Sequence, residues 1–213
     1  GLFDFMRKRE ESEPITPEIT PEVDDVLLKA LLYNETITRE KVLTLPSVNG
    51  AVDFISNTIA SMPVKLYKHK NGKVEEIIDD RVKMLNGDTN DALDGFQMRK
   101  AMVEDYLLGK GGYCFIEKDR NKVTGLYYVE DRYITIMKVY EPIHKQFQIF
   151  VGGYDNKQNE KNVGTFKPHQ FIKLLRNTKD GASGVGVTVQ LSKALETAYQ
   201  TLLYQLGMVS VGG

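Results

Sequence analysis

The sequence predicts an α+β fold because two different hydrophobic patterns occupy different parts of the chain. Apolar residues recur at helical spacing near both ends, whereas short runs rich in β-branched and aromatic residues fill the stretch 113–175. Helices, then strands, then a last helix is an order typical of α+β proteins rather than of a parallel α/β sheet. We therefore expect N-terminal helices and a β-hairpin, followed by a mostly antiparallel meander that a long C-terminal helix closes.

The first residues are expected to form a flexible arm, 1–21, ahead of a single domain, 22–213. Segment 10–21 combines several glutamates with three prolines, so it cannot bury enough apolar area to offset the entropy of ordering it. The basic triplet 7–9 could contact phosphates or an acidic partner, but such charges near a chain end are more often only solvated. The first residues predict neither a secretory signal nor a myristoylation motif.

Two amphipathic helices are predicted next. In the first, the apolar residues at helical spacing are Val23, Val26, Leu27, Ala30 and Leu31. In the second, the apolar residues recur at steps of four and three as Val48, Val52, Ile55, Ile59 and Met62. Ser47 is the expected N-cap of this second helix, and Pro63 ends it because proline cannot continue the hydrogen-bond ladder.

A β-hairpin is predicted from the strands 64–69 and 73–78. The dipeptide Asn71-Gly72 between them tolerates the positive φ angles of a type I′ turn, which matches the twist of paired strands. A short helix at 80–85 and a polar loop follow the hairpin.

A capped helix is predicted between Asp94 and Gly109. Asp94 and Gln97 have the spacing of a capping box, in which each side chain accepts a hydrogen bond from the other residue's backbone amide. The expected buried face of this helix consists of Phe96, Val103, Tyr106 and Leu107.

The β-rich middle is expected to form an antiparallel meander, because polar or glycine-containing turns separate its short apolar runs. The predicted strands are 113–117, 123–129, 133–139, 147–151 and 171–175. The long closing helix carries an apolar stripe that consists of Leu191, Leu195, Ala198, Leu202 and Leu206, widened by Tyr199 and Leu203.

Composition and charge restrict the classes of function. The chain has 213 residues, of which 41% are apolar and 27% charged, enough for a sizeable hydrophobic core, and its formal net charge is −1. So nearly neutral a chain has no overall electrostatic preference for nucleic acid, membrane surfaces or acidic ligands. No apolar run reaches the length of a membrane-spanning helix. The single cysteine, Cys114, excludes an intramolecular disulfide, and its apolar neighbours predict a small buried side chain.

The turn Gly181–Gly186 lies between a predicted strand and a predicted helix, as a nucleotide-binding loop does. The positions of its first and last glycines and of Thr188 fit that motif, but Val187 occupies the place of the lysine that contacts the β- and γ-phosphates. Ser183 does not match a nucleophile elbow, because Val185 replaces the final glycine of that motif. We therefore interpret the glycines as residues that allow a tight turn and close packing.

Residue patterns typical of metal binding or catalysis are not recognisable in the sequence. His69, His144 and His169 are isolated from one another and from Cys114, without the spacings of zinc sites. Carboxylates fall in adjacent pairs near turns or helix starts, where solvation and the helix dipole explain them. Aromatic residues interleaved with cations at 133–147 could stack on bases, but strand alternation is the more common explanation. We expect no enzyme, no cofactor, and no catalytic, cofactor-binding or metal-binding residue.

Several short motifs follow one another in a recognisable order along the chain. They are Leu45-Pro46-Ser47-Val48-Asn49-Gly50, Met62-Pro63-Val64-Lys65-Leu66-Tyr67, Lys110-Gly111-Gly112-Tyr113, the hairpin Phe115 to Leu126, Phe171-Ile172-Lys173-Leu174, and the glycine-rich turn before a long helix. This ordered set, from about Thr38 to Leu206, resembles the portal proteins of tailed bacteriophages, of the type found in long-tailed siphophages. At 110–113 and 184–188 the chain departs from the family's usual residues but keeps their small, turn-forming character.

The resemblance implies a structural subunit of a ring, generally of twelve copies, at one capsid vertex, through which DNA is packaged and ejected. The implied partners are other portal subunits, the terminase motor, capsid or scaffold proteins, head-completion and tail proteins, and double-stranded DNA, with no membrane. Hydrolysis belongs to the motor, and the implied location is the virion after synthesis in the bacterial cytoplasm. Since portal proteins continue with a stem, a clip and a crown, the chain resembles their N-terminal, wing-type portion.

A ring needs complementary faces on each subunit, and the sequence offers several candidates. The expected contact surfaces are the exposed strands of the meander and the outer faces of the helices around Val48 and Leu191. Two other functions stay open. One is a nucleotide- or nucleic-acid-binding enzyme domain that uses the turn Gly181–Gly186, and the other is a protein-interaction adaptor that forms no ring.

Overall fold

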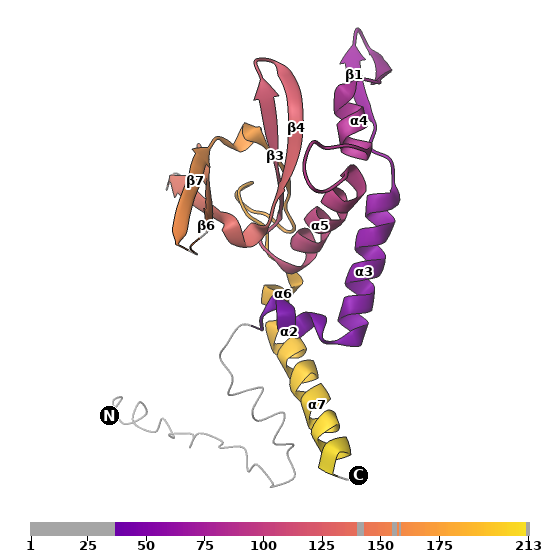
Figure 1. Cartoon of the computed structure of the whole chain (residues 1–213), viewed down its shortest axis with the longest axis vertical. Helices are drawn as coiled ribbons and strands as arrows, with labels where there is room; N and C mark the ends of the chain where they lie inside the picture. The colour runs from indigo at the N-terminus through magenta and orange to yellow at the C-terminus, as the bar shows by residue number, and fades with distance from the viewer. Residues whose placement is uncertain (1–36, 140–142, 155–156, 158, 212–213) are drawn as a thin grey trace, which may run out of the picture.

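The computed structural model describes residues 37–139, 143–154, 157 and 159–211 (Figure 1). Its helices are α2 (Arg39–Leu43), α3 (Pro46–Ser61), α4 (Asp80–Asn86), α5 (Gly95–Leu108), α6 (Val187–Gln190) and α7 (Ser192–Val211). Its strands are β1 (Leu66–Lys70), β2 (Lys73–Ile77), β3 (Gly112–Asp119), β4 (Lys122–Val129), β5 (Ile134–Val139), β6 (Gln146–Tyr154), β7 (Glu160–Phe166) and β8 (Phe171–Leu174). The predicted α+β class is confirmed, while the arm 1–21 and the helix predicted around 23–31 lie outside the described residues.

The main body is layered in the order α3, α5, a first sheet and a second sheet (Figure 1). The first sheet has the strand order β4-β3-β8 and the second β5-β6-β7, with antiparallel pairing throughout. Strand β3 contributes to the core on both faces because its side chains alternate. Cys114 packs with Met98 and Met102 of α5, whereas Tyr113 packs with Ile134 and Ile149 of the second sheet.

A third apolar cluster joins the helices at one end of the body. Its members are Ile37, Val42, Val52 and Leu108, with Leu195 and Tyr199 packed against them. This cluster holds the start of α7 against α2 and α5, and beyond it α7 projects away from the body (Figure 1). The predicted closing helix is confirmed as α7, and the short helix α6, with Leu191 as its C-cap, precedes it.

Helix α3 forms where the sequence predicts a helix, but its predicted N-cap is wrong. Pro46 takes the first helical position, where its missing N–H is not needed, so Leu45 is the N-cap and Ser47 lies inside the first turn. The helix does end before Pro63, as predicted. The apolar stripe is only partly buried. Val52 faces the core, whereas Ile55, Ile59 and Met62 are 38%, 44% and 55% exposed.

The predicted hairpin is confirmed as β1 and β2, with positive φ angles at Asn71 (51°) and Gly72 (75°). Helix α4 is also confirmed. In α5 the capping box between Asp94 and Gln97 is present, and Gly109 ends the helix as expected. The predicted buried face needs correction, since Val103 is buried but Phe96 is 37% exposed and Tyr106 and Leu107 are only half-buried. The buried residues of α5 are Gly95, Met98, Met102, Val103, Asp105 and Leu108.

The predicted strands of the middle region are confirmed, but they form two sheets rather than one continuous meander. Strand β8 follows the second sheet in the chain and returns to pair with β3 at the edge of the first sheet. Strand β7 was not predicted, because its sequence Glu-Lys-Asn-Val-Gly-Thr-Phe is mostly polar and exposed. Its backbone pairing with β6 makes it a strand, although its own side chains show no strand pattern.

Candidate functional site

The glycine-rich turn lies between β8 and α6, where the strands meet the C-terminal helix. Its first amides donate to side chains that lie just before it in the chain. The Gly181 amide donates to Thr178 Oγ1 at 2.9 Å, and the amides of Ala182 and Ser183 donate to Asp180 Oδ1 at 2.8 and 3.1 Å. A carboxylate thus occupies the donors that a phosphate would need.

The remaining amides of the turn bind backbone carbonyls from neighbouring segments. Gly184 N–H donates to the Lys110 carbonyl at 2.6 Å, and Val185 N–H donates to the Arg176 carbonyl at 2.8 Å. All five amides from 181 to 185 are therefore used inside the chain. This arrangement fixes the turn against the end of α5 and against the segment after β8.

The charge at Asp180 strengthens this closed arrangement. Burial opposes ionisation of Asp180, but the hydrogen bonds from Lys138 and from the two turn amides outweigh it and hold the pKa of this carboxyl well below its usual range. Asp180 is consequently negative at neutral pH. A negative group on these amides repels a second anion, so the turn lacks the electrostatics of a phosphate site.

The glycines of the turn have a packing role. Gly181 has a φ of +71°, a left-handed conformation that favours glycine. At Gly184 a Cβ atom would lie 2.6 Å from the Arg176 backbone nitrogen, and at Gly186 it would lie 2.5 Å from the Leu108 carbonyl carbon and oxygen. The interpretation of these residues as packing glycines is supported by these close approaches.

Two buried hydroxyl groups donate hydrogen bonds on either side of the turn. Tyr113 of β3 donates to the Ala182 carbonyl at 2.9 Å, and burial raises the pKa of its phenol above the usual range. Thr188 of α6 donates to the Leu108 carbonyl at 2.6 Å, which satisfies a carbonyl at the end of α5. The turn is therefore a rigid junction between β3, α5 and α6.

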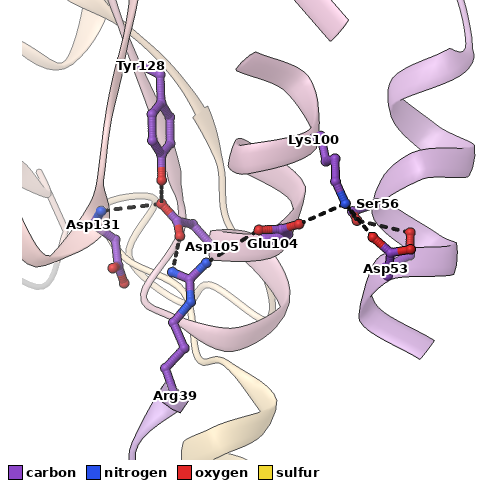
Figure 2. A network of polar contacts seen from close by, with 8 residues as sticks. All are labelled: Arg39, Asp53, Ser56, Lys100, Glu104, Asp105, Tyr128 and Asp131. Atoms are coloured by element: carbon purple, nitrogen blue, oxygen red, sulfur yellow. Dashed lines mark hydrogen bonds and ion pairs between the residues drawn. The ribbon is translucent and has the colours of Figure 1, made fainter. Parts of the chain in front are cut away.

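A second polar centre surrounds Asp105, a fully buried carboxylate on α5 (Figure 2). Its Oδ1 accepts a charge-assisted hydrogen bond from the guanidinium of Arg39 on α2. Its Oδ2 accepts hydrogen bonds from the Tyr128 hydroxyl at 2.6 Å and from the Asp131 amide at 3.3 Å. Burial raises the pKa of Asp105, and the bonds from Tyr128 and Arg39 oppose that shift.

The contacts extend from Asp105 across α5 to α3, as Figure 2 shows. Glu104 lies 3.7 Å from Arg39 and 3.1 Å from Lys100 Nζ. Lys100 Nζ also contacts Asp53 Oδ1 at 2.6 Å and donates to Ser56 Oγ at 3.3 Å. This chain of charges ties α2, α3, α5 and the β4 end together. Its centre, Asp105, is buried within the fold, whereas Tyr128 also lines an open hollow together with Tyr133 and Tyr154.

The other candidate residues are not brought together. His69, His144 and His169 lie at separate exposed places, in β1, before β6 and in the short 3-10 helix η3 (Pro168–Gln170). Cys114 is buried as predicted, and burial raises the pKa of its thiol to about 12. Within the described part of the chain, no cluster of His, Cys, Asp or Glu could hold a metal ion. Nor does any helix described here have the length and hydropathy needed to cross a bilayer.

Sequence reasoning missed Arg39, Asp105 and Asp180 as structural centres. Asp105 had a usable signal, because it follows Met98 and Met102 at helical spacing and so places a carboxylate within an apolar face. Arg39 had none, since Asp105 lies 66 residues away in sequence. Asp180 had only the local signal of an aspartate just before the turn amides that it accepts from, because Lys138 lies 42 residues away.

Comparison with known proteins gives a result that agrees with this structural character. Among curated proteins, none matches the chain significantly. The family model described as "Phage portal protein" matches residues 46–212, which includes α3, both sheets, the turn and α7. Since the match covers well over half of the 213 residues, the family is established. The chain belongs to the phage portal protein family.

Proposed function

We propose that this chain is a subunit of the portal ring, the head-tail connector through which phage DNA is packaged and ejected. The observation that carries the proposal is the family match over residues 46–212. In this role the protein occupies one vertex of the virion after synthesis in the host cytoplasm. It docks the terminase, capsid or scaffold proteins, and head-completion and tail proteins. The ring has twelve subunits in the arrangement that the family resemblance implies.

The internal chemistry of the described residues supports a structural role. The polar groups of the junction and of the Asp105 centre are bonded to one another, as expected for groups that fix helices and sheets in place. A catalytic site instead needs titratable groups that converge on an open cleft. The portal family is a structural family, and we propose that this chain has no enzymatic activity of its own.

The proposed domain organisation is a flexible arm, 1–21, followed by a wing-type domain, 22–213. Double-stranded DNA passes through the assembled ring and is not held by one subunit. This agrees with a formal net charge of −1 for the chain, which offers no general attraction to phosphates.

The test is the mass and symmetry of the purified protein. Electron microscopy at high protein concentration should show closed rings, and mass measurement should give one discrete oligomer. In particles assembled with a tagged protein, gold label should appear at one vertex. A protein that stays monomeric at all concentrations and is absent from particles contradicts the portal role and favours an adaptor.

A second measurement separates the nucleotide-enzyme alternative. Millimolar MgATP should leave the melting temperature unchanged, because the amides of Gly181 to Val185 are already bonded. A ligand that binds only the folded state must raise the melting temperature. An increase of several degrees would therefore revive a nucleotide site.

A further inference from the structure

Helix α7 carries one apolar stripe along most of its length. The residues of this stripe recur at helical spacing and are Leu195, Tyr199, Leu202, Leu203 and Leu206. We call these five residues the α7 stripe. The charged residues of α7, Lys193 and Glu196, lie near its start, and the sequence from Thr197 to Val211 contains none. The outer part of the helix therefore has an apolar face without the charged opposite face that is typical of a helix in water.

The α7 stripe is covered only over its first part. Leu195 and Tyr199 are half-buried and pack against the apolar cluster that contains Ile37. Farther along the same face, Leu203 and Leu206 are 44% and 58% exposed. Figure 1 shows that α7 has left the body by this point. One continuous apolar face is thus buried at the body and exposed beyond it, which is typical of a surface that another segment covers.

The start of the described chain lies beside this stripe. Ile37, the first described residue, is 2% exposed and belongs to the cluster on which Leu195 and Tyr199 pack. Helix α2 follows at the same place, and Lys41 Nζ lies 5.8 Å from the centre of the Tyr199 ring. The residues before Ile37 therefore join the body next to the covered part of the α7 stripe.

Residues 22–33, which we call the N-terminal segment, have the sequence pattern of an amphipathic helix. Thr20 and Pro21 before them are a helix-start signal, because threonine caps well and proline suits the first helical position. The apolar residues of the segment at helical spacing are Val23, Val26, Leu27, Ala30 and Leu31. The same spacing puts Asp25 and Lys29 on the opposite face, four residues apart, as in an ion pair that faces water. The segment thus has one apolar face to bury.

The two apolar faces match in length and in direction. At 1.5 Å per residue, a helix from Val23 to Leu31 spans roughly 12 Å, and α7 from Tyr199 to Leu206 spans roughly 10 Å. Residues 32–36 connect this predicted helix to the first described residue, a length typical of connections between packed helices. Since α7 runs away from the body and the N-terminal segment leads toward it, the two would lie antiparallel.

We propose that the N-terminal segment forms a helix that packs antiparallel on the exposed part of the α7 stripe of the same chain. A connection as short as 32–36 gives the segment an effective concentration on the order of millimolar at α7, which favours it over a second copy. The contact fixes the direction of α7, which the cluster around Ile37 holds only at its start. This inference does not depend on the proposed portal ring.

Tryptophan fluorescence tests whether the exposed part of the α7 stripe is covered. The chain contains no tryptophan, so Leu203→Trp introduces a single reporter on the stripe. Its emission in the full chain should be blue-shifted and should not change on dilution, because the cover belongs to the same chain. Tyr204→Trp is the matched control, since Tyr204 is 53% exposed and its position in the helix lies outside the stripe. The control should emit as a water-exposed tryptophan.

A charge placed in the N-terminal segment identifies what covers the stripe. Leu27→Asp, combined with Leu203→Trp, should shift the emission to the red, whereas the same change in the arm, Ile15→Asp, should not. Emission that stays blue-shifted in Leu27→Asp overturns the proposal, and its loss on dilution would then identify a second copy as the cover. Red-shifted emission of Leu203→Trp with an unchanged N-terminal segment also overturns it, because the stripe is then open to water.

Hydrogen exchange tests the same contact from the other side. The amides of 22–33 should be protected in the unchanged protein, because a packed helix opens less often than a free segment. Leu203→Asp should abolish this protection, and Tyr204→Asp should preserve it. Protection of 22–33 that is absent from the unchanged protein, or that survives Leu203→Asp, overturns the proposal. Because the exposed part of the stripe lies beyond the core clusters, both variants should keep the cooperative unfolding transition of the body in circular dichroism.

Discussion

Substitution of Arg39 by methionine isolates the electrostatic role of the Asp105 centre. Methionine keeps much of the apolar length of the arginine stem but removes the guanidinium. Asp105 then retains two neutral donors, the Tyr128 hydroxyl and the Asp131 amide, and loses its only cationic partner among the described contacts. The carboxylate itself stays fully buried. The variant therefore tests what one buried, unpaired charge costs this fold.

The expected loss of unfolding free energy at pH 7 is about 3 kcal/mol. Removing one partner of a buried ion pair costs roughly 3–5 kcal/mol, and the lower end applies because Arg39 is partly exposed and Asp105 keeps two donors. The free energy of protonating Asp105 sets an upper limit on this loss. Each pH unit above the ordinary aspartate pKa of about 3.9 adds about 1.4 kcal/mol to the cost of neutralising the group. The limit is therefore about 4 kcal/mol at pH 7 and about 1.5 kcal/mol at pH 5.

The pH dependence follows from the direction of the pKa shift. Burial already raises the pKa of Asp105, and removal of Arg39 raises it further. A group whose pKa is raised on folding favours the folded state below its unfolded pKa, and this contribution is lost as the pH rises through the folded pKa. The deficit of Arg39→Met relative to the unchanged protein should therefore shrink from pH 7 to pH 5.

Urea unfolding followed by circular dichroism measures these differences at both pH values. Arg81→Met is the matched control, because its ion pair with Asp79 is exposed and such pairs contribute little. The double variant with Asp105→Asn should recover part of the loss at pH 7, since an amide carries no charge to bury. An equal deficit at pH 7 and pH 5, or a larger one at pH 5, would refute the assignment of the cost to the buried charge.

Three further predictions concern the junction and the core. Gly186→Ala should destabilise the fold by about 1–3 kcal/mol in urea, because its Cβ meets the Leu108 backbone at 2.5 Å, while the helical control Gly50→Ala should stabilise it by about 0.5–1 kcal/mol. Asp180→Asn should lower the melting temperature at pH 7. The difference in melting temperature between the two proteins should narrow as the pH falls below about 4. Because folding lowers the pKa of Asp180, its ionised carboxyl stabilises the folded state above the unfolded pKa, and acid removes this stabilisation. Cys114 should react with iodoacetamide only after unfolding; rapid reaction of the native protein would contradict its raised pKa of about 12 and its burial.

Local signals in the sequence were sufficient for most elements of the fold. The hairpin turn at Asn71-Gly72 and the capping box of α5 depend on residues a few positions apart, so the sequence contains the whole motif. Strand β7 depends instead on its pairing with β6, because its polar residues show no clear inside and outside. Ser47 was misassigned because Pro46 competes for the start of α3 and occupies its first helical position.

The candidate surfaces could be predicted only in part. The stripe of α3 was visible as a helical period, but periodicity does not tell whether an apolar face turns toward its own core or toward a partner. In the structure Val52 takes the core position, whereas Ile55 and Ile59 turn outward. The hollow beside Gly152 and Gly153 had no sequence signal, because it arises from the register shift of β6 against β7 and from the approach of Tyr133 to the rings of Phe150 and Tyr154.

The turn Gly181–Gly186 shows why a glycine-rich motif cannot be interpreted by spacing alone. In a phosphate-binding loop the glycines leave amide donors open toward the ligand. Here the same kind of spacing brings the backbone close to Arg176 and Leu108, and Asp180 takes the donors that an anion would use. Whether such a turn binds an anion or packs against its own chain therefore depends on whether its amides already donate hydrogen bonds within the chain. In this chain the occupied amides make the turn a fixed link between β8 and the helices α6 and α7.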